Sequence, residues 1–335
     1  MSPNKSSDQS NQSLSRVLDR ILVSPLIVLD GGAKGGTREL VRLARYISAY
    51  GFEANRSEYD KIVRNPSASG SPQYKRISYL PLALAECSGK VTLYITKRPG
   101  ATSTLRPNAE LLAHFERDNW SQMREVVSEQ VVEAISLRDF IMREHLSSID
   151  YIKLDTQGNE LHILRSAGEL VQKISVIKTE VELIPVYMSQ PLLGDICSFL
   201  TSQGFQLVDL HWTDPCRRYH FSPSLPKGSY RLVWAEAIFA YDPFNVSKER
   251  TLEQAIILAE LGYLDLGLYI LGRLTSLADA DRELLLRYYQ EPPGGRECSW
   301  LKRLVKKHAP GQLLEVYRIL KQGKTSQSKE VTRIP

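Results

Sequence analysis

The chain has 335 residues, of which 42% are hydrophobic and 24% are charged, a composition typical of a soluble globular protein. It holds no apolar run of the ~18 residues that a membrane-spanning helix needs, and its four cysteines show no CxxC spacing, which argues against a disulfide framework. The basic residues behind the net charge of +5 are concentrated after residue 290, which we interpret as a solvated helical face rather than a nucleic-acid-binding surface.

Shifts in composition along the chain predict four segments. We expect residues 1–20 to be a disordered polar lead-in without the apolar core of a signal peptide, and with the scattered cysteines this favours a cytoplasmic protein. Residues 21–243 are predicted to be the main domain, residues 244–322 a helical extension and residues 323–335 a disordered tail. In the extension, two short helices around the sequence GYLD are expected to form a cap on the main domain.

The main domain is predicted to open with a strand, a glycine-rich loop and a helix. Residues 26–30 form an apolar run, and the sequence DGGAKGGT leads into an amphipathic helix expected over residues 37–49. Such a loop lets the backbone approach a ligand at a helix N-terminus that favours negative charge. A dinucleotide-binding fingerprint would use Gly31, Ala33 and Gly36, and the alanine in its central position weakens that interpretation.

Two acidic residues indicate which cofactor this loop would serve. Asp30 ends the first strand, where a carboxylate would repel a pyrophosphate and would pair with an ammonium group. S-adenosylmethionine carries an ammonium, a carboxylate and a sulfonium, so it suits a site that combines an acid with backbone N–H donors. Glu53 follows 23 residues later, at the end of a second strand in the sequence GFEAN, and this spacing suits the two ribose hydroxyls of either S-adenosylmethionine or NAD.

Strands and helices alternate through the rest of the main domain. Strands are predicted at residues 76–86, 90–96, 149–155, 176–183, 206–212 and 232–240, and helices at 136–145, 158–171 and 193–205. Ser136 precedes Asp139 by three residues, which is the spacing of a capping box at a helix start. This alternation predicts an α/β fold with a parallel sheet covered by helices on both faces.

With these elements placed, residues 26–241 resemble the FkbM-type methyltransferases, a family of S-adenosylmethionine-dependent O-methyltransferases that act on natural products and sugars. Four stretches carry the resemblance in order: VLDGGAKGGT, GFEAN, IDYIKLDTQGNELHILRSA and TEVELIPVYMSQPLLGDICSFLTSQGFQLVDL. The resemblance implies a Rossmann-like, class I methyltransferase sheet of seven strands, parallel except for one antiparallel strand, with residues 232–240 in the last hairpin. It also implies S-adenosyl-L-methionine as the cofactor and a hydroxyl of a small molecule, sugar or glycan as the acceptor.

The cofactor is expected to lie over the carboxyl ends of the strands. The residues expected to bind it are Asp30, Gly31, Gly32, Ala33, Gly35, Glu53 and Asp155. Asp155 also ends a strand on this side, which makes it a candidate general base or metal ligand, with a purely structural role as the alternative. Glu180, which shares one strand face with Glu182, is the second candidate catalytic residue.

The remaining titratable residues near these motifs are given less specific roles. We expect Glu160 to pack or cap and His162 to lie at the surface, because the two do not share a helix face. Tyr187 is a candidate lining residue of the acceptor pocket. The segment from His211 to His220 matches no standard zinc spacing, so we expect no metal and interpret it as an acceptor-side loop.

Two other functions stay open on the sequence alone. An NAD-linked oxidoreductase would use the same type of sheet, although Asp30 and Ala33 argue against it. A methyltransferase-like core that does not catalyse, and whose C-terminal helices bind a partner protein, would accommodate Lys34 and Gln157. For the enzyme, we expect a small-molecule or carbohydrate acceptor as partner, with no nucleic acid and no membrane span, and the sequence leaves the oligomeric state open.

Overall fold

The computed structural model describes residues 15–66, 72–114, 120–211, 232–245, 250–275 and 277–290. The chain divides into two compact units, Leu18–Arg282 and the combination of Met1–Val17 with Glu283–Pro335. The first unit holds both sheets, and the described residues of the second are helical. Residues 15–21 are helical, which corrects the expectation of disorder at residues 15–20. Residues 1–14 and the acceptor-side loop after residue 211 lie outside the described residues.

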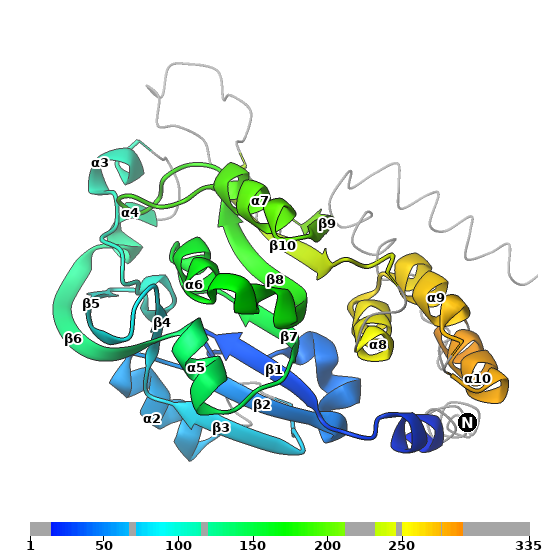
Figure 1. Cartoon of the computed structure of the whole chain (residues 1–335). Coiled ribbons are helices and arrows are strands. Elements are labelled where there is room, and N and C mark those ends of the chain that lie inside the picture. The colour runs from blue at the N-terminus through cyan, green and yellow to red at the C-terminus, as the bar shows by residue number, and fades with distance from the viewer. Residues whose placement is uncertain are drawn as a thin grey trace, which may run out of the picture. The chain divides into compact units, whose positions relative to one another are not determined.

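The larger sheet has seven strands in the order β3-β2-β1-β7-β8-β10-β9 (Figure 1). β10 pairs antiparallel with β8 and β9, whereas the other pairings in this sheet are parallel. The strands are β1 Leu26–Gly31, β2 Ile47–Phe52, β3 Arg76–Leu80, β7 Ile149–Leu154, β8 Ile174–Glu182, β9 Phe205–His211 and β10 Trp234–Tyr241. This sheet confirms the predicted class I methyltransferase fold, and it places the carboxyl ends of β1 and β7 side by side.

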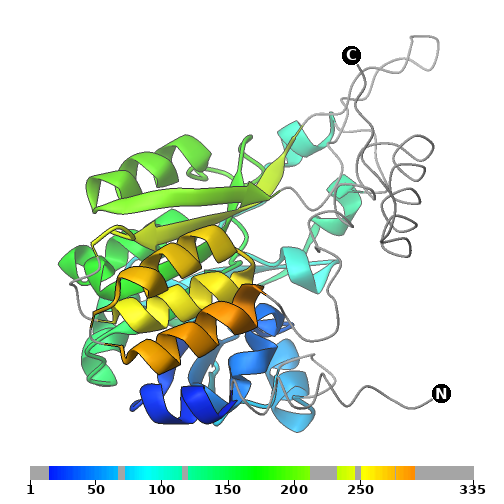
Figure 2. The ribbon, with the colours of Figure 1, turned by 90° about the vertical axis from the view of Figure 1, so that its right-hand side faces the viewer.

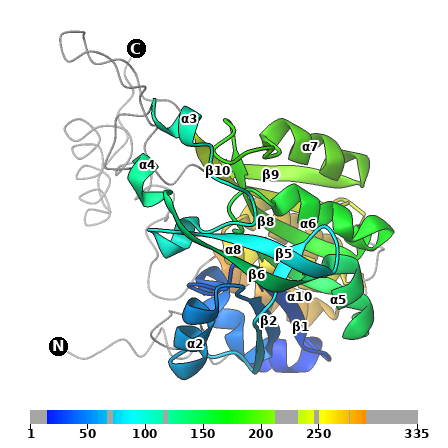
Figure 3. The same ribbon diagram turned by 90° about the vertical axis from the view of Figure 1, so that its left-hand side faces the viewer.

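A smaller sheet of three strands is inserted in the chain between β3 and α5 (Figure 3). Its strands are β4 Ala83–Ala85, β5 Gly89–Thr96 and β6 Val126–Ser136, and β6 pairs parallel with β4 and antiparallel with β5. The strand predicted over residues 76–86 is therefore two strands in two sheets, with Pro81 between them. The sequence analysis missed β6, because only its last three residues are buried.

Helices cover both faces of the larger sheet. α5, α6 and α7 lie on one face and η1 and α8 on the other (Figures 1 and 2). The helices are η1 Arg38–Tyr46, α2 Arg56–Arg64, η2 Pro99–Ala101, α3 Ala109–Leu112, α4 Trp120–Met123, α5 Leu137–Arg143, α6 Glu160–Ser166, η3 Gly168–Lys173, α7 Leu193–Ser202, α8 Thr251–Leu261, α9 Leu264–Arg273 and α10 Asp279–Gln290. The Ser136 side chain accepts the N–H of Asp139 at 3.0 Å, which confirms the predicted start of α5. Within the described chain, no helix is long and apolar enough to cross a membrane.

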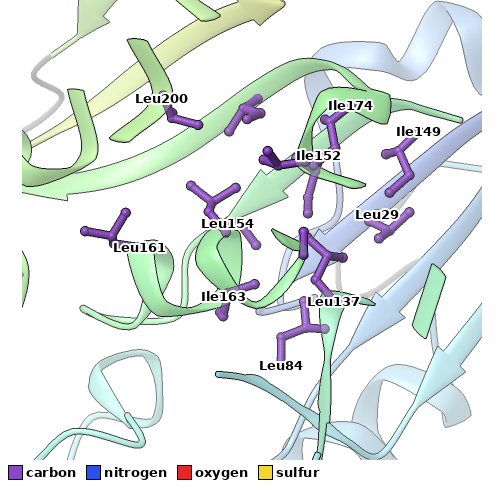
Figure 4. Close-up of a cluster of buried hydrophobic side chains, with 14 of the residues drawn as sticks. Leu29, Leu84, Leu137, Ile149, Ile152, Leu154, Leu161, Ile163, Ile174 and Leu200 are labelled. Carbon is purple, nitrogen blue, oxygen red and sulfur yellow. The ribbon is translucent and has the colours of Figure 1, made fainter. Parts of the chain in front are cut away.

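One hydrophobic core fixes the central strands against α5, α6 and α7 (Figure 4). Leu29 of β1 and Ile152 and Leu154 of β7 are at most 1% exposed and pack with Leu161 and Leu164 of α6. Burial of each such side chain contributes roughly 1.5–3 kcal/mol. The backbone that carries the predicted site residues at the ends of β1 and β7 is therefore held on a well-packed support.

The helix predicted over residues 37–49 is shorter and of another type. η1 is a 3₁₀ helix that ends at Tyr46 and has non-helical dihedral angles at Leu40. Residues 47–49 instead begin β2, where Ile47 and Ala49 are buried and Ile47 pairs with Leu26 of β1. The apolar residues Leu40, Leu43, Ala44 and Ile47 have the spacing of one helix face. Ile47 nevertheless belongs to a strand, because pairing with β1 buries its side chain fully.

The helical pair around GYLD packs as predicted. The buried Gln254 side chain of α8 donates hydrogen bonds of 2.9 Å to the carbonyls of Ser175 and Tyr241, which attaches the helix to the sheet. α9 approaches α8 closely at Gly267, where a Cβ atom would lie 2.9 Å from the Ala255 carbonyl oxygen. Within the first unit, α8 and α9 thus form a cap on one face of the sheet.

Candidate functional site

The glycine-rich loop makes close contact with the loop that follows β7. The N–H of Asp155 donates to the Gly31 carbonyl at 2.9 Å, and a Cβ atom on Gly32 would lie 2.2 Å from the Asp155 carbonyl oxygen. Gly32 also has a φ of +85°, which side chains rarely adopt. Glycine is therefore required here by the neighbouring loop as well as by the backbone conformation.

The backbone donors of the glycine-rich loop are largely used within the protein. The N–H groups of Gly32 and Ala33 both donate to the Phe52 carbonyl, at 3.1 and 2.9 Å. At the start of η1, the N–H of Thr37 donates to the Tyr74 hydroxyl at 3.1 Å. A phosphate cradle needs such N–H groups to point at the ligand. This geometry agrees with the sequence argument against a pyrophosphate at this loop.

A cavity of about 160 Å³ lies at the carboxyl ends of β1, β2 and β7. Its walls are the loops after these strands together with β4, β5 and residues around η2, so the small sheet closes one side. Four of the predicted cofactor-binding residues line it: Gly31, Gly32, Glu53 and Asp155. Lys34 also lines the cavity, and its ammonium lies 3.0 Å from a carboxylate oxygen of Glu58. We refer to this space as the first cavity.

Glu53 lines the first cavity, and the pKa of its carboxyl group is raised. Burial raises its pKa to about 7, although its Oε1 accepts the N–H of Asn55 at 2.8 Å, which opposes the rise. The group therefore changes its protonation state near neutral pH. In the ionised form its two oxygens can accept hydrogen bonds from two hydroxyls, as the sequence analysis expected for a ribose.

Asp30 meets a positive charge, but the charge belongs to the protein. Its Oδ1 lies 3.3 Å from the Lys153 ammonium, and the two side chains are 7% and 11% exposed. Burial by itself would lower the pKa of Lys153, and the carboxylates of Asp30, Asp155 and Glu39 together more than offset this, so the pKa is raised. Burial also raises the pKa of Asp30, and the Lys153 ammonium opposes that rise. The residues that line the first cavity do not include Asp30, Ala33 or Gly35, so a direct contact of these three with the cofactor stays a prediction.

Gln157 connects the two predicted catalytic carboxylates. Its Nε2 donates to Asp155 Oδ1 at 2.9 Å and to Glu180 Oε2 at 2.6 Å, and its Oε1 lies 3.0 Å from the Tyr187 hydroxyl. Its backbone is in the left-handed region, with a φ of 62°, and its carbonyl accepts a hydrogen bond of 2.8 Å from Ser103. The structure thus brings together Asp155, Glu180 and Tyr187, which the sequence analysis selected separately.

Burial raises the pKa of Glu180 and of Glu182 well above the ordinary value, and neighbouring carboxylates raise each further. Glu160 is 1% exposed and accepts the N–H groups of Thr156 and Gly158 at 2.7 and 2.9 Å, so of the two expected roles it has the packing one and fixes the loop before α6. In the described part of the chain, no three His, Cys, Asp or Glu side chains are arranged to hold a metal ion.

A second cavity of about 150 Å³ adjoins the first and shares Asp155 with it. Its other lining residues are Lys153, Leu154, Lys178, Glu180, Trp234 and Glu236. The sequence analysis missed Lys153, Lys178 and Glu236 as site residues. Each of the apolar strand sequences YIKLD and VIKTE contains one lysine, which could have marked these positions as unusual. That the two lysines are neighbours depends on the register between β7 and β8, which the sequence does not give.

The family model described as the methyltransferase FkbM domain matches residues 35–207. Among curated proteins, the search found no match. Similar solved structures include methyltransferase FkbM from Methylobacillus flagellatus KT, with 16% identity and a TM-score of 0.34 over 65% of this chain and 44% of that one. The chain therefore spans less than half the length of that relative.

Two further structures show the range of the similarity. Magnesium protoporphyrin IX methyltransferase from Synechocystis PCC 6803 with bound SAM has 12% identity and a TM-score of 0.31, over 69% of this chain and 78% of that one. Precorrin-6y C5,15-methyltransferase from Geobacter metallireducens GS-15 has 9% identity and a TM-score of 0.31, over 71% and 94%. Because residues 35–207 make up more than half of the 335-residue chain, the protein belongs to the FkbM methyltransferase domain family.

Proposed function

We propose that the protein is an S-adenosylmethionine-dependent O-methyltransferase that acts on a hydroxyl of a small molecule, sugar or glycan. The observation that carries this proposal is the place of Asp155, a residue that lines both cavities and that directly follows β7. Methyl transfer needs a donor and an acceptor held in line, with a base beside the acceptor oxygen. A carboxylate at the junction of a donor space and an acceptor space meets that need.

The first cavity fits the methyl donor. Its wall contributes the carboxyl groups of Glu53 and Asp155, which suit the hydroxyls and the positive charge of S-adenosylmethionine better than they suit a pyrophosphate. We assign Glu53 to the ribose hydroxyls, and Gly31 and Gly32 to the close approach of the ligand to the backbone. When bound, the cofactor supplies an electrophilic methyl group on a sulfonium whose leaving group is a neutral thioether.

The residues of this chain supply orientation and proton transfer. Asp155 accepts the proton of the acceptor hydroxyl as the new bond to carbon forms. Gln157 fixes this carboxylate through the hydrogen bond of 2.9 Å and connects it to Glu180. Glu180 lines the second cavity and accepts the hydrogen bond of 2.6 Å from Gln157, and we assign it the role of second base on the acceptor side.

Calorimetric titration of the full chain with S-adenosylmethionine, S-adenosylhomocysteine and NAD tests the assignment of the cofactor. We expect the first two to bind with micromolar affinity and NAD not to bind. Glu53→Gln should weaken binding by roughly 10- to 150-fold, as expected for hydrogen bonds to a charged acceptor worth roughly 1.5–3 kcal/mol. Asp60→Asn is the matched control, because Asp60 lies outside the cavity wall and pairs with Arg56 on α2. Tighter binding of NAD, or unchanged affinity in Glu53→Gln, would contradict the proposal.

A further inference from the structure

The second cavity is built on a row of charged side chains that crosses the large sheet. Asp30 of β1, Lys153 of β7 and Lys178 of β8 occupy neighbouring register positions and therefore share one sheet face. The Lys178 ammonium lies 3.6 Å from Glu39 Oε1 and 3.1 Å from Glu236 Oε1, and its side chain is 17% exposed. The row thus provides two largely buried ammonium groups at the floor of a polar space.

Stabilisation of the fold alone does not explain why these charged side chains are buried in the sheet. Buried ion pairs contribute little net stability compared with apolar side chains of the same size, because both charges lose their hydration. Elsewhere on β7 and β8, Ile152, Leu154, Val176 and Ile177 are fully apolar and at most 1% exposed. Asp30, Lys153 and Glu180 lie within two residues of the carboxyl ends of their strands, where ligands bind in open α/β sheets. The buried Asp150 at the other end of β7 is paired with Arg250 instead.

The balance of charge in the second cavity restricts what it can hold. Lys153 and Lys178 face the carboxyl groups of Asp155, Glu180 and Glu236 in the cavity wall. Their further partners are two more acids, Asp30 and Glu39. Carboxyl groups outnumber ammonium groups even if Glu180 keeps its proton, so an anionic ligand would be repelled at short range.

The hydrogen-bonding groups in the wall suit a ligand rich in hydroxyls. Each ammonium has three N–H donors, and each carboxylate has two acceptor oxygens. A hydroxyl both donates and accepts, so a polyol can satisfy both kinds of group without adding charge. Trp234 adds an aromatic side chain to the same wall, and the flat face of a sugar ring packs well against such a surface.

We propose that the second cavity is the acceptor subsite and that it selects an uncharged, polyhydroxylated group over its anionic analogue. This inference rests on the proposed function. The acceptor hydroxyl points to Asp155, which takes its proton. The acceptor oxygen forms a bond to the methyl carbon while the bond between this carbon and the sulfonium sulfur breaks, and the sulfur keeps the electron pair.

Paired probes test this charge selection. The full chain, saturated with S-adenosylhomocysteine, is titrated with methyl β-D-glucopyranoside and methyl β-D-glucuronide, and with glycerol and glycerol 3-phosphate, and binding is followed by saturation-transfer NMR. In each pair we expect the neutral compound to bind at least tenfold more tightly. Glu236→Gln removes one negative charge from the wall and should reduce this preference at least threefold by improving the binding of the anion. Glu133→Gln is the matched control, because Glu133 lies on β6 and its nearest cationic partner is Lys90, at 4.0 Å.

The outcomes separate this inference from the proposed function. Binding of S-adenosylhomocysteine is measured on the same samples, and its absence in the unmodified chain would contradict the proposed function itself. If S-adenosylhomocysteine binds, three results overturn the subsite: equal or tighter binding of the anionic compounds, no binding of either pair, or a preference that Glu236→Gln leaves unchanged. A change in Glu133→Gln as large as that in Glu236→Gln would also overturn it, because the effect would then not come from the cavity.

Discussion

Replacement of Lys153 by methionine should destabilise the protein strongly, because it leaves the buried Asp30 carboxylate without its partner. The two charges are 3.3 Å apart, and their side chains are 7% and 11% exposed. At an effective dielectric constant of about 20, this separation corresponds to roughly 5 kcal/mol of attraction. Loss of one partner of a buried pair typically destabilises a protein by about 3–5 kcal/mol. We therefore expect a decrease of this size in the free energy of unfolding of Lys153→Met.

The double variant Asp30→Asn with Lys153→Met gives the decisive comparison. Removal of both charges leaves no unpaired ion, so most of the lost stability should return, to within about 1–2 kcal/mol of the unmodified protein. Urea unfolding at pH 7.5 measures all variants, and Lys90→Met, which removes an exposed lysine, should change stability by less than about 1 kcal/mol. A double variant as unstable as Lys153→Met would refute the reasoning.

The same double variant tests the sequence-based role of Asp30. If Lys153 is its functional partner, the double variant keeps its affinity for S-adenosylmethionine to within about threefold. If Asp30 instead binds the ammonium of the cofactor directly, affinity falls by tenfold or more even though stability returns. The titration therefore separates a residue that supports the sheet from one that touches the ligand.

Three further predictions follow from the geometry of the loops and the buried carboxyl groups. Because burial raises the pKa of Glu53 to about 7, the folded state holds its proton more tightly than the unfolded state, so stability should fall as pH rises from about 4.5 to 7, by at most about 3 kcal/mol. Glu53→Gln should flatten this part of the pH profile of urea unfolding, and an unaltered slope would contradict the assignment. Gly32→Ala should destabilise by about 2–4 kcal/mol through backbone clash and strain, whereas Gly35→Ala, with a φ of +104° and open space around it, should lose only about 1 kcal/mol in the same assay. Arg250→Met should lower the thermal unfolding midpoint and cost about 3–5 kcal/mol, because it removes the hydrogen bonds of 2.6 and 2.9 Å to the fully buried Asp150, and a loss below 1 kcal/mol would count against that pair.

The sequence predicted the fold well where apolar runs alternate with capped helices. The runs around Leu29, Ile152 and Ile177 are buried strands, and Ser136 begins its helix with the expected hydrogen bond. It failed where tertiary contacts decide between two local patterns. Ile47 continues a helical spacing and yet forms a strand, because β1 offers it a partner.

The candidate site was predicted in part, for a similar reason. Glu53 and Asp155 are the first residues after β2 and β7. Their positions at the carboxyl edge of the sheet could therefore be predicted from the order of elements along the chain. Asp30 could be identified as an acid that needs a positive partner, but Lys153 lies 123 positions away and becomes its neighbour only through the register of β1 and β7. Contacts of this kind depend on pairing between distant segments, which the local sequence does not encode.

The contact between the glycine-rich loop and the loop after β7 couples the two cavities that these loops line. Gly31 and Asp155 share a backbone hydrogen bond, and Gly32 lies against the Asp155 carbonyl, so neither loop can shift alone. A ligand that stiffens one loop stiffens its neighbour and reduces the conformational entropy that a second ligand must still remove. We therefore expect a methyl donor and an acceptor to bind with positive cooperativity, and thermodynamic linkage requires the same factor in both directions.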